Sequence, residues 1–237
     1  GQSGHYLWPA ATLLADALVQ SSSSLLLREQ PPPRTLVELG AGCALLSCLA
    51  LQLWQPSLEC LIVTDHDPGT LERARDNYES TLQTLLDATD TVSEEALNDM
   101  INGTASIAAA FETLAWGSDT DIKAVRQWLG EHNSRHRRRA DVILGSDLIY
   151  DTAVVEPLLR TARDLLAADG VFVLSQSFRY EEATEEEIDS SCDALGLERT
   201  IIMDQESGNR RIQKFRLMEE QDCSVNSFTE DAATSLA

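Results

Sequence analysis

The sequence predicts an α/β fold, with a doubly wound, mostly parallel seven-stranded sheet and an antiparallel C-terminal strand. Short apolar runs alternate with longer stretches that repeat apolar residues at helical spacing, which is the pattern of strands joined by crossover helices. A glycine-rich turn follows the first apolar run, at the place where such sheets bind ligands. The turn-like residues 206–209 join the last two runs directly, so these form a hairpin and the final strand opposes the others.

The expected strands are short runs dominated by apolar residues, as in parallel sheets that are buried on both faces. They cover residues 36–39, 60–64, 111–116, 140–145, 170–175, 198–203 and 211–217. The expected helices flank these runs at 9–20, 44–53, 72–86, 121–129, 154–166 and 188–195. Pro9 suits the first turn of the first helix, and Asp151 or Thr152 suits the N-cap of the fifth.

The length of 237 residues suits one domain with a complete core. We expect this domain over residues 1–219, with an acidic insertion at 87–105 and a flexible acidic tail at 220–237. No apolar run approaches the ~20 residues of a membrane span, and the first residues lack the order of a signal peptide. We therefore expect a cytoplasmic protein without a membrane partner, and leave the nucleus open. Because the chain begins at Gly1, we also expect native sequence before it.

The charge of the chain is strongly acidic, with 39 acidic and 18 basic residues and a net charge of -21. Such a field repels the phosphates of nucleic acids and attracts basic partners, so we expect a basic partner and no nucleic acid. The run RHRRR at 135–139 opposes this trend. We favour the interpretation that this run is a solvated loop before the next strand. The alternative is a binding surface for an acidic partner.

The cysteines predict buried reduced thiols rather than a disulfide framework. There are five of them, an odd number, with no CxxC pair and no clustered histidines. We therefore expect neither a zinc site nor any other metal site.

The turn after the first strand belongs to the segment LVELGAGCALLS at 36–47, and it contains Gly40 and Gly42. Glycine lets the backbone turn sharply and lets a ligand touch the main chain. A dinucleotide fingerprint would need a third glycine at the position of Leu45, and the chain contains no GxxxxGK[ST]. Phosphate cradling is therefore not favoured, while a purely structural turn stays open.

A carboxylate accompanies this turn: Asp65 lies 23 positions beyond Gly42, at the end of the second strand. A carboxylate at that place can accept both hydroxyls of a ribose. We favour a ligand role over a capping role for Asp65. For Asp67, which precedes Pro68, we favour the helix cap.

The pattern Glu38-x-Gly40-x-Gly42 with Asp65 resembles the cofactor site of the class I, seven-β-strand S-adenosylmethionine-dependent methyltransferases. Four more segments resemble, in order, the methyltransferase family 16 group of protein lysine methyltransferases. They are SGHYLWPAATLLADAL at 3–18, TDHDP at 64–68, LAWG at 114–117 and SDLIYD at 146–151. The resemblance covers about residues 4–180. The chain departs from the group in lacking a strand-rich segment before the first helix and in its long insertion, and both departures concern substrate recognition.

The resemblance implies a Rossmann-like methyltransferase with S-adenosylmethionine as cofactor and S-adenosylhomocysteine as product. Residues 38–42 would hold the methionine end, with Glu38 close to its ammonium group. Asp65 would hold the ribose, and Trp116 would border the adenine. Trp8 would close the cofactor pocket from the first helix. Core packing is the alternative for each tryptophan.

The acceptor side is predicted at Asp147 and Tyr150, which match the Asp-x-x-Tyr pattern of the resembled group. A lysine amine, with an ordinary pKa of about 10.4, must lose its proton before it attacks. A carboxylate and a phenol at a strand end would align this amine, and an apolar channel would lower its pKa. A turn cap at Asp147 and simple packing of Tyr150 are the alternatives, and Phe178 and Arg179 would line the same mouth or a solvent-facing loop.

The expected function is therefore methyl transfer to a lysine side chain of a protein by a monomeric enzyme. Two other interpretations stay open. One is transfer to a small molecule or to another protein nitrogen on the same fold. The other is a methyltransferase-like module that binds partners without catalysis.

Overall fold

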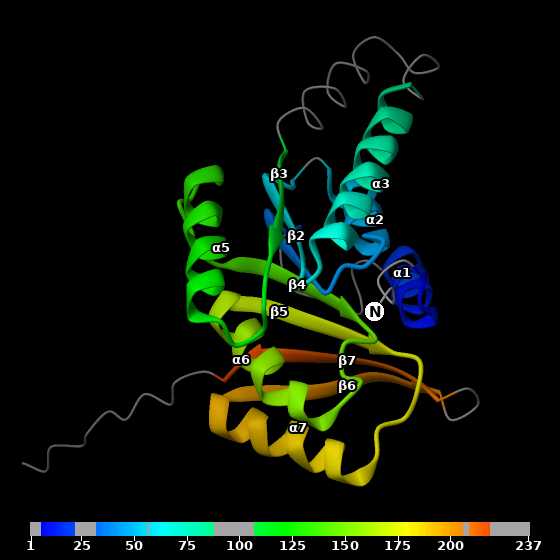
Figure 1. Cartoon of the computed structure of the whole chain (residues 1–237), viewed down its shortest axis with the longest axis vertical. Coiled ribbons are helices and arrows are strands. Elements are labelled where there is room, and N and C mark those ends of the chain that lie inside the picture. The colour runs from blue at the N-terminus through cyan, green and yellow to red at the C-terminus, as the bar shows by residue number, and fades with distance from the viewer. Residues whose placement is uncertain (1–5, 22–31, 56, 88–106, 206–208, 219–237) are drawn as a thin grey trace, which may run out of the picture.

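The computed structural model describes residues 6–21, 32–55, 57–87, 107–205 and 209–218. Seven strands form one sheet in the order β3-β2-β1-β4-β5-β7-β6 (Figure 1). The strands are β1 (Thr35–Leu39), β2 (Cys60–Asp65), β3 (Ala108–Thr113), β4 (Ala140–Ser146), β5 (Leu166–Gln176), β6 (Leu197–Gln205) and β7 (Arg210–Leu217). The helices are α1 (Pro9–Ser21), α2 (Leu45–Trp54), α3 (Pro68–Asp87), α5 (Asp119–His132), η3 (Thr152–Val154), α6 (Val155–Leu165) and α7 (Glu182–Leu195).

The sheet topology confirms the predicted fold class. Strands β1 to β5 pair in parallel, whereas β7 runs antiparallel to both β5 and β6. The final strand is therefore the one that opposes the rest. The order in which strands are added reverses at β1, because β2 lies on one side of it and β4 on the other. The loops after β1 and β4 therefore meet at this switch point.

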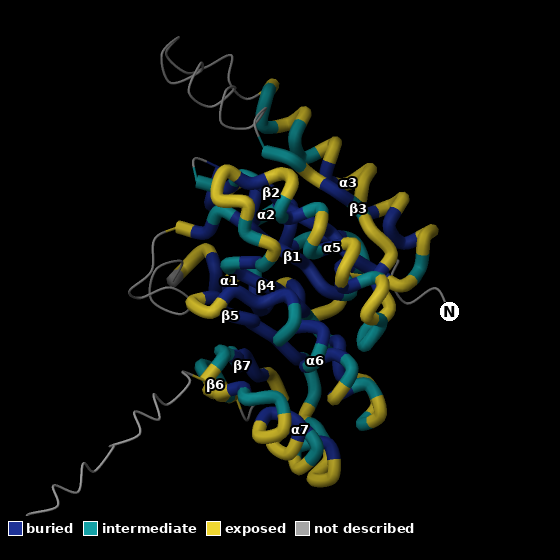
Figure 2. The backbone as a smooth tube through the Cα atoms, turned by 90° about the vertical axis from the view of Figure 1, so that its left-hand side faces the viewer, coloured by how far each residue is buried: buried dark blue, intermediate teal, exposed yellow. Residues whose placement is uncertain are grey.

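Two apolar cores sandwich the sheet. Helices α1, α2 and α3 cover one face, and α5, α6 and α7 cover the other (Figure 1). Neighbouring residues of a strand feed opposite cores: Leu36 belongs to the first and Val37 to the second, and Leu61 and Ile62 repeat the pattern. This two-sided burial, visible along β4 and β5 in Figure 2, explains why the strand sequences are continuous apolar runs.

The third strand lies three residues before its predicted position. Ala108 to Ala110 pair with β2, although alanines give little apolar signal, and the ladder ends at Thr113. Trp116 is consequently a loop residue rather than the end of a strand. At β5 the strand begins earlier than predicted, at Leu166, and a register shift separates the Ala140 and Val142 pairings with it.

Two other predictions concern local segments. Asp67 accepts hydrogen bonds from the Thr70 N–H and hydroxyl, both at 2.8 Å, and so caps α3, as predicted. The RHRRR run leads into β4, and two of its arginines are used within the fold. Arg137 pairs with Asp169 at 3.1 Å, and Arg139 donates to the carbonyl oxygen of Leu166 at 2.9 Å.

Several predictions fall on residues outside this description. The tail at 220–237, the insertion at 87–105 apart from Asp87, and most of the turn at 206–209 belong to this group. Cys48, Cys60 and Cys192 are buried and form no disulfide, as predicted, whereas Cys43 is only half-buried. Within the described ranges, no helix combines the length and apolar character that crossing a membrane requires.

Candidate active site

The predicted site residues lie at the edge of the sheet where the parallel strands end. Glu38 belongs to β1, Asp65 ends β2, Trp116 follows β3 and Asp147 follows β4. These four strands are neighbours in the order β3-β2-β1-β4, so their carboxyl ends are side by side. The topology thus gathers residues that are far apart in sequence.

The glycine turn adopts a conformation that side chains disfavour. The φ angle is +57° at Gly40 and +53° at Gly42, and Ala44 follows at +58°. A Cβ atom at Gly40 would lie 2.6 Å from Cδ2 of Leu148 and 3.3 Å from Cζ2 of Trp116. Gly40 is therefore required both by its backbone angle and by the closeness of its neighbours.

Asp65 joins the loops after β1 and β2. Its side chain is nearly buried, with the residue 6% exposed. One carboxylate oxygen accepts the N–H of Gly42 at 3.1 Å, and the other accepts the N–H of Asp67 at 3.1 Å and faces Nδ1 of His66 at 3.2 Å. The carboxylate is thereby oriented by backbone groups at the mouth of the glycine turn.

Glu38 lies beneath the same turn and is 2% exposed. One of its oxygens accepts the Ser47 N–H at 2.9 Å and also the Ser47 hydroxyl. The pKa of Glu38 is raised to about 7, and burial is the largest cause. The hydrogen bonds from Ser47 and the Leu46 backbone oppose this rise, and the charge of Asp65 adds a smaller rise. The carboxyl group therefore ties β1 to the first turn of α2 and titrates near neutral pH.

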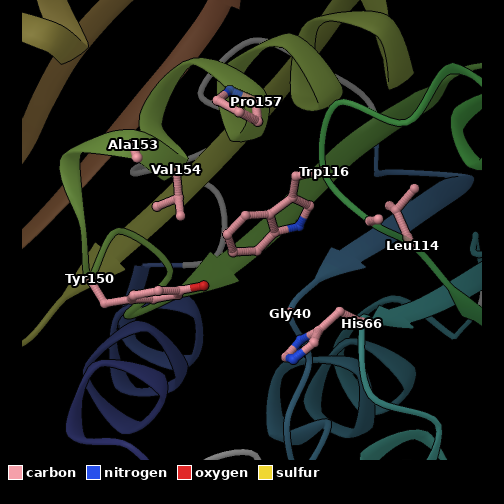
Figure 3. A pocket seen from close by; sticks show the side chains of 9 residues that line it. Gly40, His66, Leu114, Trp116, Tyr150, Ala153, Val154 and Pro157 are labelled. Carbon is pink, nitrogen blue, oxygen red and sulfur yellow. The ribbon is translucent and has the colours of Figure 1, made fainter.

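A pocket of about 280 Å³ opens beside Gly40. Its aromatic and imidazole side chains are Trp116, Tyr150 and His66, which Figure 3 shows converging from three sides. Tyr150 is 72% exposed, so its ring stands at the rim. The remaining lining is mostly apolar, from Leu114, Ala115, Ala153, Val154 and Pro157.

The loop that carries Trp116 is held at both ends. Before the indole, the Ala115 N–H donates to Asp121 at 3.0 Å. After it, the Gly117 N–H donates to the Thr161 hydroxyl of α6 at 2.8 Å. These two hydrogen bonds fix the backbone on either side of Trp116, whose indole lines the pocket.

Asp147 connects three segments on the other side of the pocket. Its φ angle is +51°, in the left-handed region. The Ser177 N–H and hydroxyl donate to its two carboxylate oxygens at 2.7 Å each, and the Ala10 N–H lies 3.4 Å from one of them. Asp147 thus links the ends of β4 and β5 to the start of α1, where Trp8 is 45% exposed.

The structure brings Gly40, Trp116 and Tyr150 into one pocket lining. The other predicted residues, Trp8, Glu38, Gly42, Asp65 and Asp147, do not line this pocket. Sequence reasoning did not single out Ser47, His66, Leu148 or Ser177. Ser47 donates to the carboxyl group of Glu38, and Ser177 donates to that of Asp147. Each serine reaches its partner only in the folded chain. His66 follows Asp65 directly in the sequence, and this adjacency could have indicated that His66 lies at the site.

Comparison with known proteins identifies the family. The family model described as lysine methyltransferase matches residues 1–188. The chain belongs to the lysine methyltransferase family. A curated relative, the protein-lysine N-methyltransferase EFM3 of Saccharomyces cerevisiae, is 24% identical over 230 residues, which cover 92% of this chain. The match spans 57% of EFM3, so this lysine methyltransferase family chain corresponds to only part of that relative.

Solved structures share the fold of this family member. An rRNA methyltransferase, AviRa from Streptomyces viridochromogenes, superposes with a TM-score of 0.54 at 18% identity, covering 90% of this chain and 86% of the other. An O-methyltransferase family protein from Burkholderia thailandensis gives 0.53 at 14% identity, covering 89% and 60%. The CurJ carbon methyltransferase gives 0.55 at 14% identity, covering 88% and 54%. At these identities the likeness concerns the Rossmann-like methyltransferase fold alone.

Proposed function

We propose that this chain transfers a methyl group from S-adenosylmethionine to a lysine side chain of a protein and releases S-adenosylhomocysteine. Family membership supports the reaction class, and the description of EFM3 supports a protein lysine as acceptor. One arrangement carries the proposal: a single pocket is lined by Gly40, Trp116 and Tyr150. Asp65 is bonded to the same glycine turn at Gly42, and Asp147, three residues before Tyr150, is bonded to Ser177.

The residues present suit S-adenosylmethionine. Asp65 offers an oriented carboxylate for a ribose diol, and Trp116 offers an aromatic border for a purine in a largely apolar pocket. The glycine turn borders the pocket at Gly40, and the methionine end would lie beside it. When bound, this cofactor supplies an electrophilic methyl group on a sulfonium.

The acceptor side suits an amine that arrives from solvent. Tyr150 stands exposed at the pocket rim, and Asp147 is held rigidly by Ser177. In the proposed reaction Asp147 steadies the arriving amine, and Tyr150 orients it for in-line attack once its proton has left for solvent. The negative field of the chain favours a basic protein as the source of this amine.

Titration calorimetry tests the proposal. The 237-residue chain is titrated with S-adenosylmethionine and S-adenosylhomocysteine, and with NAD as the control nucleotide. We expect one site for each sulfur compound and no heat from NAD, since Leu45 replaces the glycine of a dinucleotide fingerprint. Absence of binding by both sulfur compounds would refute the proposal.

A further inference from the structure

A second pocket, of about 380 Å³, lies on the other side of Tyr150. One wall is formed by residues 149–152, after β4, and the other by residues 178–181 and Thr184, where β5 leads into α7. Of the described lining residues, Tyr150 alone belongs to both pockets. A group in this second pocket would therefore sit beside the first pocket and next to the proposed acceptor residues.

The two walls of the second pocket are tied to each other. The hydroxyls of Thr152 and Thr184 are 2.7 Å apart and share a hydrogen bond. Below them, the Ser177 N–H donates to Asp147 at 2.7 Å. These bonds connect the loop after β4 with the loop after β5, so the pocket is formed in advance rather than assembled by a ligand.

The charge of the lining is negative. Asp151 and Glu181 are exposed, and no ion pair of the described ranges includes either of them. The lining also contains Arg179, but this cation pairs with Asp204 at 3.0 Å, and Asp204 pairs in turn with Arg211. The two carboxylates at the rim are therefore available to a cation from outside.

Apart from Ile149, the remaining lining is aromatic. The rings of Phe178 and Tyr180 meet edge to face at 5.9 Å, and the exposed ring of Tyr150 lies on the opposite wall. The Tyr180 hydroxyl is buried and has no hydrogen-bond partner among the described residues. Buried polar groups nearly always have one, so this hydroxyl is a candidate contact for a ligand or for water that a ligand brings. Aromatic faces with nearby carboxylates recognise basic side chains.

We propose that the second pocket binds an arginine or lysine side chain that flanks the methylated lysine in the protein substrate. This inference rests on the proposed function and adds a specificity site to it. The methylated lysine itself is assigned to Asp147, which lines neither pocket, and to the side of Tyr150 that faces the first pocket. The pocket would read a neighbouring basic residue, and so set which lysines are chosen.

A binding measurement tests the pocket without any methyl transfer. Acetyl-Gly-Arg-Gly-amide and its citrulline analogue, which has the same shape but no charge, are titrated into the protein and followed by amide NMR. We expect the arginine peptide to shift the amides of 151–152 and 180–184 and the citrulline peptide to leave them unchanged. Equal shifts from both peptides, or none from either, would overturn the inference.

A pair of matched variants tests the carboxylates. The double variant Asp151→Asn and Glu181→Gln removes both charges, and asparagine keeps the cap that Asp151 provides to the Ala153 N–H. The control, Glu186→Gln with Asp193→Asn, removes two exposed charges of α7 outside the lining. We expect binding of the arginine peptide to weaken about fivefold in the first variant and to change less than about twofold in the control. If both double variants bind the arginine peptide equally weakly, the effect comes from the overall negative charge and the proposed binding pocket is refuted.

Turnover assays link the pocket to the reaction. Peptides with a central lysine carry arginine or citrulline at each flanking position in turn, and the ratio of their kcat/KM values is measured. We expect the wild type to prefer arginine at one position and Asp151→Asn with Glu181→Gln to lose that preference, while the control keeps it. An unchanged preference would refute the specificity role. A protein that binds the arginine tripeptide but methylates no lysine would retain the pocket and refute the proposed function instead.

Discussion

The acids at the ends of β1 and β2 are almost fully buried, with Glu38 2% and Asp65 6% exposed, whereas Tyr150 beyond β4 is 72% exposed. On the β1–β2 side, carboxylates are oriented by backbone N–H groups, and Gly40 leaves no room for a side chain. On the β4–β5 side, Asp147 is anchored but the surrounding side chains face solvent. The β1–β2 side is therefore closed around its acids, whereas the β4–β5 side presents an exposed aromatic ring, that of Tyr150, to solvent.

The solved structures that superpose are named for rRNA, carbon and O-methylation, so one fold accompanies several methyl acceptors. In the proposed function, the β1–β2 side binds the cofactor and the β4–β5 side binds the acceptor. Substitutions on the two sides should therefore separate cofactor binding from turnover.

Replacing Asp65 should have the largest effect. Asp65→Ala removes the proposed ribose acceptor and leaves the Gly42 and Asp67 N–H groups without their partner. We expect affinity for S-adenosylmethionine to fall more than about 100-fold, since two charge-assisted hydrogen bonds are lost. Asp67→Asn, which alters only the α3 cap, should keep affinity within about threefold. Calorimetry on both variants checks this, and equal affinity of Asp65→Ala and wild type would remove Asp65 from the site.

The pKa of Glu38 gives a prediction about pH and stability. Because the folded-state pKa is raised from 4.5 to about 7, the contribution of this group is fully present below about pH 4.5 and is lost as pH rises through 7. Relative to Glu38→Gln, the wild type should lose up to about 3 kcal/mol of unfolding free energy between about pH 4 and pH 8. Urea denaturation of both proteins across this range measures the difference. If the unfolding free energies of the two proteins vary with pH in the same way, the pKa of Glu38 is not raised by folding.

Alanine at two left-handed glycines separates backbone strain from crowding. Gly40 has φ +57° and Gly196 has φ +66°, but only Gly40 would bring a Cβ atom against neighbours, whereas Gly196 has nothing within 4 Å. Each Gly→Ala change should cost about 1–2 kcal/mol of stability through the φ angle alone. Only Gly40→Ala should also weaken S-adenosylmethionine binding, by about tenfold. Equal affinity in the two variants would mean that Gly40 is a turn residue and nothing more.

Tyr150→Phe should have the smallest effect and should fall entirely on turnover. The side chain is mostly exposed, so stability should change by less than about 0.5 kcal/mol. Cofactor affinity should stay within about twofold, while kcat with a lysine peptide falls several-fold, because the phenol that orients the amine is gone. A loss of cofactor affinity as large as the loss of kcat would place Tyr150 on the cofactor side instead.

The strands and the acids at their ends were predictable from sequence for one physical reason. Burial on both faces gives a strand segment such as 171–174 an unbroken apolar sequence, and a parallel sheet then brings Glu38, Asp65 and Asp147 to one edge. Segments without that signal were misplaced. Ala108 to Ala110 carry only a weak strand signal, and the acidic first half of α7, from Glu182, hides its helical period.

The partners of the site acids could not be predicted. Ser47 and Ser177 are ordinary polar residues whose roles depend on tertiary contacts with Glu38 and Asp147. The second pocket likewise depends on bonds between distant loops, such as Thr152 with Thr184. The number of residues between two such partners does not predict their contact, because the fold of the intervening chain decides how far apart they lie.

Transfer of an isotopically labelled methyl group tests the central proposal most directly. The chain and its Asp147→Asn variant are incubated with S-adenosylmethionine that carries a trideuterated methyl group and with cell extract, and modified residues are located by mass spectrometry. Asparagine tolerates the left-handed backbone of position 147, so the variant should fold and bind cofactor normally. The proposed function predicts labelled lysines in protein with the wild type and at least about tenfold fewer with the variant. Label on no lysine, or on another residue type or a small molecule alone, would contradict it.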